Sequence, residues 1–218
     1  MKIKVIACEV MKEELLLVNT ENTVDWHFVS MGLHTRPQKL QEELKSILEK
    51  ITEDYDRVIL GFGLCGGAVR GLKADHYTLT IPRIHDCIPV FLGSRKRFEQ
   101  LQKTPGTFYL TSGWLECGTP VMTEYQRVCQ KYGEKKAKIV FSRMYDSYKR
   151  VLFLHTDHPR DEAGLAASKE IAVLLELECH TTDGSSDYLN KLVNGPWEEA
   201  EFIQLEPGEV LKDSHFNP

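Results

Sequence analysis

The stretch Arg57-Val-Ile-Leu-Gly-Phe-Gly-Leu-Cys-Gly-Gly67 runs from a short apolar segment directly into a turn that holds four glycines. Its first part, residues 57–61, has the length and the β-branched content of a buried strand. Glycine accepts backbone angles that other residues avoid, so the turn can be tight and can lead into a helix near residues 68–72. A strand, a glycine turn and a helix in this order are typical of a parallel sheet covered by helices.

The same alternation of apolar runs and helical periodicity extends through the rest of the chain. It predicts strands at 3–7, 23–30, 77–81, 106–110, 150–154, 178–181 and 202–205, and helices at 12–18, 37–51, 87–101, 121–132, 162–177 and 187–193. We therefore expect an α/β fold with a mostly parallel sheet and helices on both faces, with two Rossmann-like lobes around a cleft as one arrangement. Residues 1–145 would form the main lobe, and residues 146–218 a smaller lobe or a continuation of the same sheet.

The composition argues against partners that need a basic surface. The chain has 27 Lys and Arg against 32 Asp and Glu, a net charge of −5, and its cations are scattered, so we expect neither nucleic acid nor a membrane as a partner. No apolar run reaches the roughly 20 residues of a membrane span, and the N-terminus lacks a signal-peptide pattern. We expect a cytoplasmic protein whose six cysteines stay reduced.

Reactive or polar side chains follow five successive strands of the predicted sheet. They are Cys8, His34, Cys65, the group His85, Asp86 and Cys87, and the group Thr111, Ser112 and Trp114. Ligands of open α/β sheets bind beyond the carboxyl ends of the strands, so we expect all these residues at one edge. A single cysteine or histidine is more often a core or hydrogen-bonded residue than a ligand. The coincidence over several strands favours a functional cluster.

Cys65 is surrounded by Gly63, Gly66 and Gly67, which would let the backbone approach a substrate closely. The amides at the start of the following helix would favour a thiolate, which can bind a metal or attack an electrophile. The spacing departs from the G-x-G-x-x-G fingerprint, and no acidic residue ends the second strand, so a nucleotide is not expected. The alternative is an incidental cysteine in a tight turn.

Thiols and imidazoles together suit a soft or borderline divalent ion. The expected ligands are Cys8, His34, Cys65, His85 and Cys87. Zinc fits this set best, while iron, nickel and cobalt stay open. Asp86 would orient an imidazole or act as a base, which makes Cys65, His85 and Asp86 the catalytic candidates.

Several polar residues near the same strand ends would bind a substrate. Arg83 would hold an anionic group by bidentate contacts. Thr111 and Ser112 would donate hydrogen bonds, and Trp114 would stack over the ligand or pack in the core. His155 would close the pocket from the second lobe. The residues expected to be structural or at the surface are Cys117, Cys129, Cys179 and His158.

Three segments carry a family resemblance: Gly61-Phe-Gly-Leu-Cys-Gly66, Ile81-Pro-Arg-Ile-His-Asp-Cys-Ile88 and Tyr109-Leu-Thr-Ser-Gly-Trp114. Over nearly its whole length the chain resembles domain-of-unknown-function family 1638, found in methanogens and other anaerobes. No reaction follows from that resemblance. Members are often encoded beside corrinoid-dependent methyltransferases, which implies a link to methyl-group or corrinoid metabolism. This chain has no D-x-H-x-x-G corrinoid motif, so a corrinoid would arrive on a partner protein.

Three functions stay open on the sequence. The first is a metal-dependent enzyme that transfers a methyl or other one-carbon group to or from a small molecule. The second is a protein that carries a metal or cofactor for a methyltransferase system without turnover of its own. The third is a metal-free enzyme with Cys65 as nucleophile and His85 as base, which requires a thiol of depressed pKa. The substrate and any homo-oligomeric state are undetermined.

Overall fold

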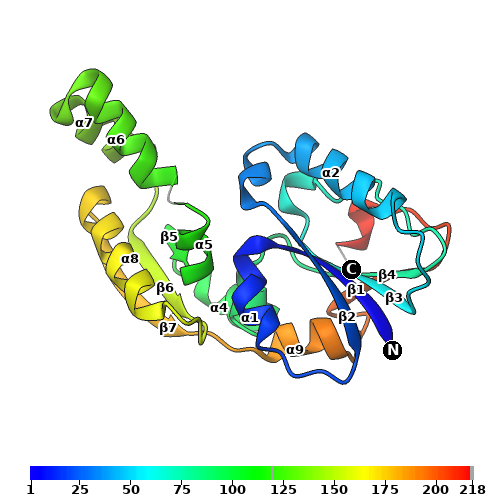
Figure 1. The fold of residues 1–218 in the computed structure, drawn as a ribbon. Coiled ribbons are helices and arrows are strands. Elements are labelled where there is room, and N and C mark those ends of the chain that lie inside the picture. The colour runs from blue at the N-terminus through cyan, green and yellow to red at the C-terminus, as the bar shows by residue number, and fades with distance from the viewer. Residues whose placement is uncertain (119, 217–218) are drawn as a thin grey trace.

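In the computed structural model, which describes residues 1–118 and 120–216, the short apolar runs form strands that divide between two sheets (Figure 1). The five-stranded sheet has the order β2-β1-β3-β4-β8, and the three-stranded sheet has the order β5-β6-β7. The strands are β1 (Lys2–Cys8), β2 (Thr23–Val29), β3 (Arg57–Gly61), β4 (Thr78–Pro82), β5 (Thr107–Leu110), β6 (Arg150–His155), β7 (Glu178–Asp183) and β8 (Phe202–Leu205).

Helices cover both sheets and connect their strands. The α-helices are α1 (Lys12–Leu16), α2 (Pro37–Glu49), α3 (Ile88–Phe91), α4 (Arg95–Leu101), α5 (Ser112–Glu116), α6 (Pro120–Tyr132), α7 (Glu134–Met144), α8 (Asp161–Leu175) and α9 (Asp187–Asn194). Short 3-10 turns are η1 (Glu9–Met11), η2 (Met31–Thr35), η3 (Cys65–Gly67) and η4 (Asp213–His215). No helix in the described ranges is long and apolar enough to cross a membrane.

The first lobe is built on the five-stranded sheet. β1 lies between β2 and β3, and its side chains Ile3, Val5 and Ile6 are completely buried. All strand pairs in this sheet are parallel except β4 with β8, which confirms the mostly parallel sheet. α2 begins at Pro37, which suits the first turn of a helix. α2 and α9 lie on either side of the sheet in Figure 1.

The second lobe is built on the parallel strands β5, β6 and β7. α8 packs on this sheet, and α6 and α7 form a helical hairpin that projects away from the first lobe (Figure 1). Its core contains Phe141, Val151, Phe153 and Ile171. Leu152, on β6, belongs instead to the core of the first lobe. The two lobes therefore share apolar packing along their seam.

The division between the lobes differs from the expected boundary near residue 145. β5 precedes that boundary but pairs with β6, whereas β8 follows it and pairs with β4. The chain thus crosses into the second lobe before β5 and returns after β7. Consecutive parallel strands joined by a crossover usually lie side by side, and β5 with β6 follows that rule. The expectation that five strand ends share one edge is therefore wrong, because the fifth belongs to the other sheet.

Two predicted helices also differ from the structure. Residues 68–71 form turns rather than a helix; Gly67 precedes them and Gly71 ends them, and the positive φ angles of these two glycines, 92° and 69°, do not occur in a regular α-helix. The helix expected over 87–101 is split into α3 and α4 at Gly93, where φ is 74°.

Candidate functional site

Three of the expected ligands lie together beyond the carboxyl edge of the first sheet. Cys8 ends β1, Cys65 opens η3 just after β3, and Cys87 precedes α3 just after β4. They are near enough that the charges of Cys8 and Cys65 would raise the pKa of Cys87. All six cysteines are free thiols. We call Cys8, Cys65 and Cys87 the thiol cluster.

Burial keeps these thiols protonated. It raises the pKa of Cys8 and of Cys65 to about 12, and that of Cys87 well above its ordinary value. Desolvation penalises the thiolate, and neighbouring thiols add to the effect. A thiolate in this cluster therefore needs a compensating cation or a new hydrogen-bond donor.

Trp114 and Cys117 approach the thiol cluster from the second lobe. The indole N–H of Trp114 is buried without a hydrogen-bond partner among the described residues, and it lies close enough to Cys87 to oppose the rise of its pKa. Cys117 lies close enough to Cys8 for its charge to raise the pKa of Cys8. Cys117 was expected to be structural, and sequence reasoning missed its position because that position depends on the docking of α5 on η1, two elements that lie about a hundred residues apart in the chain.

The expected histidines have unequal surroundings. The His34 ring stacks on Phe62 with centroids 6.0 Å apart, and its Nε2 is buried with no hydrogen-bond partner in the described chain. Burial lowers the pKa of His34, which keeps it neutral. His85 is exposed, while its carbonyl accepts a 3.0 Å hydrogen bond from the amide of Cys65. His34 thus has a ring nitrogen without a partner among the described residues, while the side chain of His85 is open to solvent.

Several expected site residues have structural contacts instead. Asp86 accepts a 2.9 Å hydrogen bond from the amide of Ile88 and so caps the start of α3; burial raises its pKa. The Nε of Arg83 donates to the carbonyl of Glu199 at 2.9 Å, which holds the segment before β8. A Cβ at Gly63 would meet the backbone of residues 84–86, so this glycine lets two loops pack together.

The backbone at the start of η3 is tightly turned. Cys65 itself has a φ of 46°, and Gly66 and Gly67 have φ angles of 67° and 92°. A positive φ is unusual for a residue with a side chain and occurs often at functional sites.

Among the residues that the structure describes, no three His, Cys, Asp or Glu side chains form a finished metal-ligand group. Metal binding at the thiol cluster would therefore require side-chain rotation.

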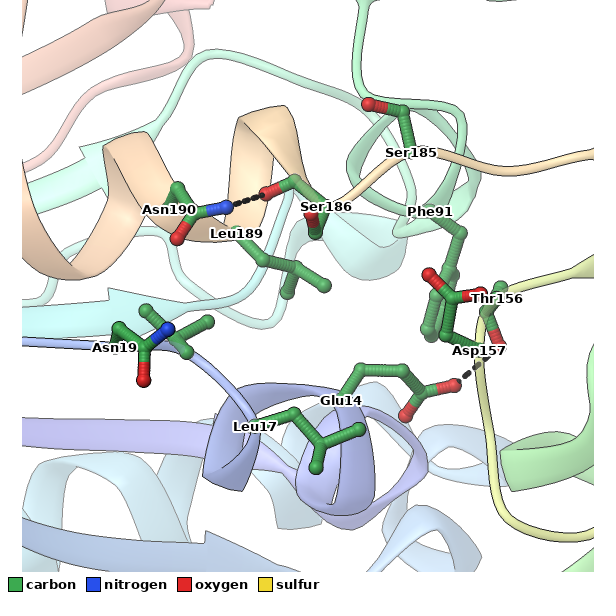
Figure 2. A pocket seen from close by; sticks show the side chains of 11 residues that line it. Glu14, Leu17, Asn19, Phe91, Thr156, Asp157, Ser185, Ser186, Leu189 and Asn190 are labelled. Atoms are coloured by element: carbon green, nitrogen blue, oxygen red, sulfur yellow. Dashed lines mark hydrogen bonds between the residues drawn. The ribbon is translucent and has the colours of Figure 1, made fainter.

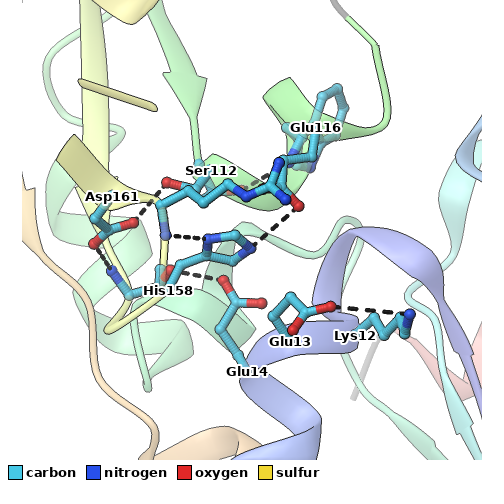
Figure 3. Close-up of polar contacts among 11 residues, drawn as sticks. Lys12, Glu13, Glu14, Ser112, Glu116, His158 and Asp161 are labelled. Carbon is cyan, nitrogen blue, oxygen red and sulfur yellow. Dashed lines mark hydrogen bonds and ion pairs between the residues drawn. The ribbon is translucent and has the colours of Figure 1, made fainter. Parts of the chain in front are cut away.

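A second polar group joins the lobes beside α1 (Figure 3). Ser112 donates a 2.6 Å hydrogen bond to Asp161, which also accepts a 2.9 Å bond from the amide of Thr156. The Thr156 hydroxyl then donates to Glu14 Oε1 at 2.7 Å. The carboxyl end of β6 is thereby attached to α1 of the other lobe. Ser112 and Thr111 are buried, and Thr111 caps α5, so neither is open to a substrate.

His158 was expected at the surface, and that expectation is wrong. Only 4% of its surface is exposed. Its Nδ1 accepts a 3.1 Å hydrogen bond from the amide of Arg160, which places the ring proton on Nε2, 3.7 Å from Glu116 Oε2 (Figure 3). His155 lies nearby, with Nδ1 3.5 Å from Asp161 Oδ2. The loop after β6 folds inward against α5. The sequence shows only a histidine before a proline, a pattern typical of surface turns, so it does not reveal this packing.

A cavity of about 210 Å³ lies at the seam, between α1, the loop after β6 and the start of α9 (Figure 2). Its polar lining includes Glu14, Asn19, Thr156, Asp157, Ser186 and Asn190. Sequence reasoning missed Glu14, although a charged residue in a short helix directly after the first strand could have indicated it. Glu14 is 3% exposed, and its Oε2 has no hydrogen-bond partner in the described residues.

Burial raises the pKa of the Glu14 carboxyl, while the bond from Thr156 and the nearby His158 oppose the rise. A carboxyl with a higher pKa in the folded than in the unfolded state binds more protons when folded, so stability falls as pH rises through that window. Glu14→Gln keeps an acceptor for Thr156 but carries no charge. We expect Glu14→Gln to become more stable relative to wild type as pH rises above about 4, the range in which an ordinary glutamate loses its proton.

Urea unfolding of both proteins at several pH values measures this difference. Glu13→Gln is the matched control, because Glu13 is on the same helix with 41% of its side chain exposed. A stability difference between Glu14→Gln and wild type that does not change with pH would contradict the expectation.

The comparisons with known proteins give one match. No curated protein and no solved structure matches the chain. A family model covers residues 28–193, which is more than half of the chain; the match includes Cys65, Cys87 and the three strands of the second lobe, and it leaves out β1 with Cys8. The chain therefore belongs to the family described as Protein of unknown function (DUF1638).

Proposed function

We propose that this protein is a metal-dependent enzyme that acts on a small molecule, with zinc bound by Cys8, Cys65 and Cys87. The observation that carries the proposal is the meeting of three thiols from the ends of three neighbouring strands. Parallel sheets bind their ligands at this edge. Three soft donors suit zinc and leave a fourth position for His34, Cys117 or a substrate.

The surroundings of the thiol cluster support this donor set. Burial makes free thiolates unfavourable there, and a bound divalent cation would supply the missing charge. The unpartnered N–H of Trp114 would donate to the sulfur of Cys87 once that sulfur is deprotonated. The unpartnered Nε2 of His34 is a neutral donor of the kind that zinc accepts.

The reaction we propose is transfer of a methyl or other one-carbon group, with a small thiol as acceptor. Zinc would act as a Lewis acid that lowers the pKa of the substrate thiol. The exposed His85 at the rim of the site would take up the proton that this thiol releases. The donor would be a methylated corrinoid carried by a partner protein or a methyltransferase.

Two other functions could use the thiol cluster, and each differs from the zinc enzyme in the behaviour that it predicts. A metal-handling protein would bind the same ion but exchange it readily and show no turnover. A metal-free cysteine enzyme needs a thiol of low pKa, whereas burial raises the pKa of Cys65 and the nearby Asp86 adds to the rise. The direction of this shift favours the metal-bound alternatives.

Elemental analysis of the untagged protein, purified without oxygen, tests the proposal. We expect close to one equivalent of zinc per chain, retained through dialysis against a weak chelator. Protein that stays metal-free after reconstitution with zinc, iron, nickel or cobalt would contradict it. Loss of the ion within minutes to a chelator, with no methyl transfer to a small thiol, would favour the metal-handling function.

A further inference from the structure

The cavity at the seam is a second candidate site, separate from the thiol cluster. It is lined by α1, by the loop after β6 and by the start of α9, and none of the six cysteines contributes to it. Pockets at the junction of two lobes are frequent ligand sites. The cavity has a volume of about 210 Å³, below the roughly 300–1,000 Å³ of pockets for drug-sized ligands. Only a small molecule would fit in it.

The charge of the lining selects the kind of occupant. Glu14 and Asp157 contribute carboxyl groups, and Asn19 and Asn190 contribute side-chain amides (Figure 2). Among the described residues that line the cavity, none is Lys, Arg or His. An anionic ligand would find no opposite charge there. A cation would be attracted to both carboxylates.

Glu14 adds a requirement for hydrogen-bond donors. Its carboxyl is buried, and Thr156 already donates to Oε1, so Oε2 is the oxygen left without a partner in the described chain. A buried carboxylate oxygen that lacks a donor is costly, and a charged N–H donor repays that cost best. A quaternary ammonium has no N–H and could not satisfy it.

We infer that the cavity at the seam binds a small molecule with a primary ammonium group, which is balanced by Asp157 and pairs with the Glu14 carboxyl once that carboxyl turns its buried, unpartnered Oε2 toward the cavity. The apolar part of the ligand would be short because the cavity holds only about 210 Å³. It would pack against Leu17, Phe91 and Leu189, which also line the cavity. Burial raises the pKa of Glu14, and a nearby ammonium would oppose that shift. The ligand would also bridge the lobes, since Glu14 lies in α1 of the first lobe and Thr156 follows β6 of the second.

NMR titration with n-propylammonium tests this inference, followed through the backbone amides of Thr156 and Asn190. We expect saturable shifts in wild type, at least about tenfold weaker binding in Glu14→Gln, and unchanged binding in Glu13→Gln. Tetramethylammonium, which has the same charge but no N–H, should bind at least about tenfold more weakly than n-propylammonium. Absence of saturable shifts in wild type, or equal binding of both cations, would overturn the assignment.

Metal content measured in the same samples separates this site from the thiol cluster. We expect Cys65→Ser to bind n-propylammonium as wild type does. Metal-free protein that still binds the amine would support the inference about the cavity and contradict the proposal of a zinc enzyme. Loss of amine binding in Cys65→Ser would place the amine at the thiol cluster and overturn the inference.

Discussion

Cys65→Ser and Cys87→Ser are expected to lose the bound metal, from close to one equivalent per chain to less than about a tenth. A serine hydroxyl at neutral pH is a far poorer zinc ligand than a thiolate. Losing even an outer-shell partner weakens metal binding about 10–100-fold, so the loss of a direct ligand should exceed that. Elemental analysis after gel filtration of oxygen-free protein measures the change.

Cys129→Ser and Cys179→Ser are the matched controls, because these cysteines lie on α6 and β7 of the second lobe, away from the strand ends of the first. They should keep the wild-type metal content. Circular dichroism of all four variants shows whether metal loss reflects the site or the fold. Equal metal content in all four variants would contradict the proposed zinc site.

A Cys117→Ser variant would show whether Cys117 is the fourth ligand of the proposed zinc ion. It approaches Cys8 from the second lobe, and burial raises its pKa to about 12. If Cys117→Ser retains metal while Cys8→Ser loses it, the fourth position belongs to His34 or to a substrate. Only the second case leaves the coordination position open to a substrate, which is what a catalytic zinc site requires.

Local sequence determined most of the first lobe. The apolar run at residues 57–61 became β3 with those bounds and is buried on both faces, as an unbroken apolar run predicts. The periodicity after Pro37 became α2, which buries the face that its apolar positions share. β5 has the same kind of apolar pattern, yet it joins the other sheet. Pairing partners depend on contacts between distant segments, which a single strand's pattern does not contain.

The thiol cluster could be predicted because, like the strands, it follows from local sequence patterns. Cys8, Cys65 and Cys87 each follow a strand of one parallel sheet, so their order along the chain was enough to place them at one edge. Arg83 follows β4 too, but its guanidinium turns to the backbone near β8, a strand more than a hundred residues away. The seam residues Glu14 and His158 meet only because two lobes dock, and no periodicity encodes that docking.

Gly113→Ala is expected to destabilise the fold by changing how the lobes meet. Gly113 lies in α5, and a Cβ there would clash with the backbone carbonyl oxygen of Val10 in η1. Because the obstacle is backbone, one of the two elements must move, at a cost of about 3 kcal/mol. Alanine returns about 1 kcal/mol through its higher helix propensity. The net loss of about 2 kcal/mol should lower Tm by roughly 4–8 °C.

Calorimetry of Gly113→Ala beside Gly32→Ala tests this account of the seam. Gly32 is exposed, and a Cβ there would have only an ordinary contact, 3.6 Å from Ser30 Oγ, so the control should stay within about 0.5 kcal/mol of wild type. An unchanged Tm in Gly113→Ala would mean that α5 does not rest on η1. Trp114 lies in α5 and Cys117 follows it, so the proposed roles of both residues at the thiol cluster depend on this docking.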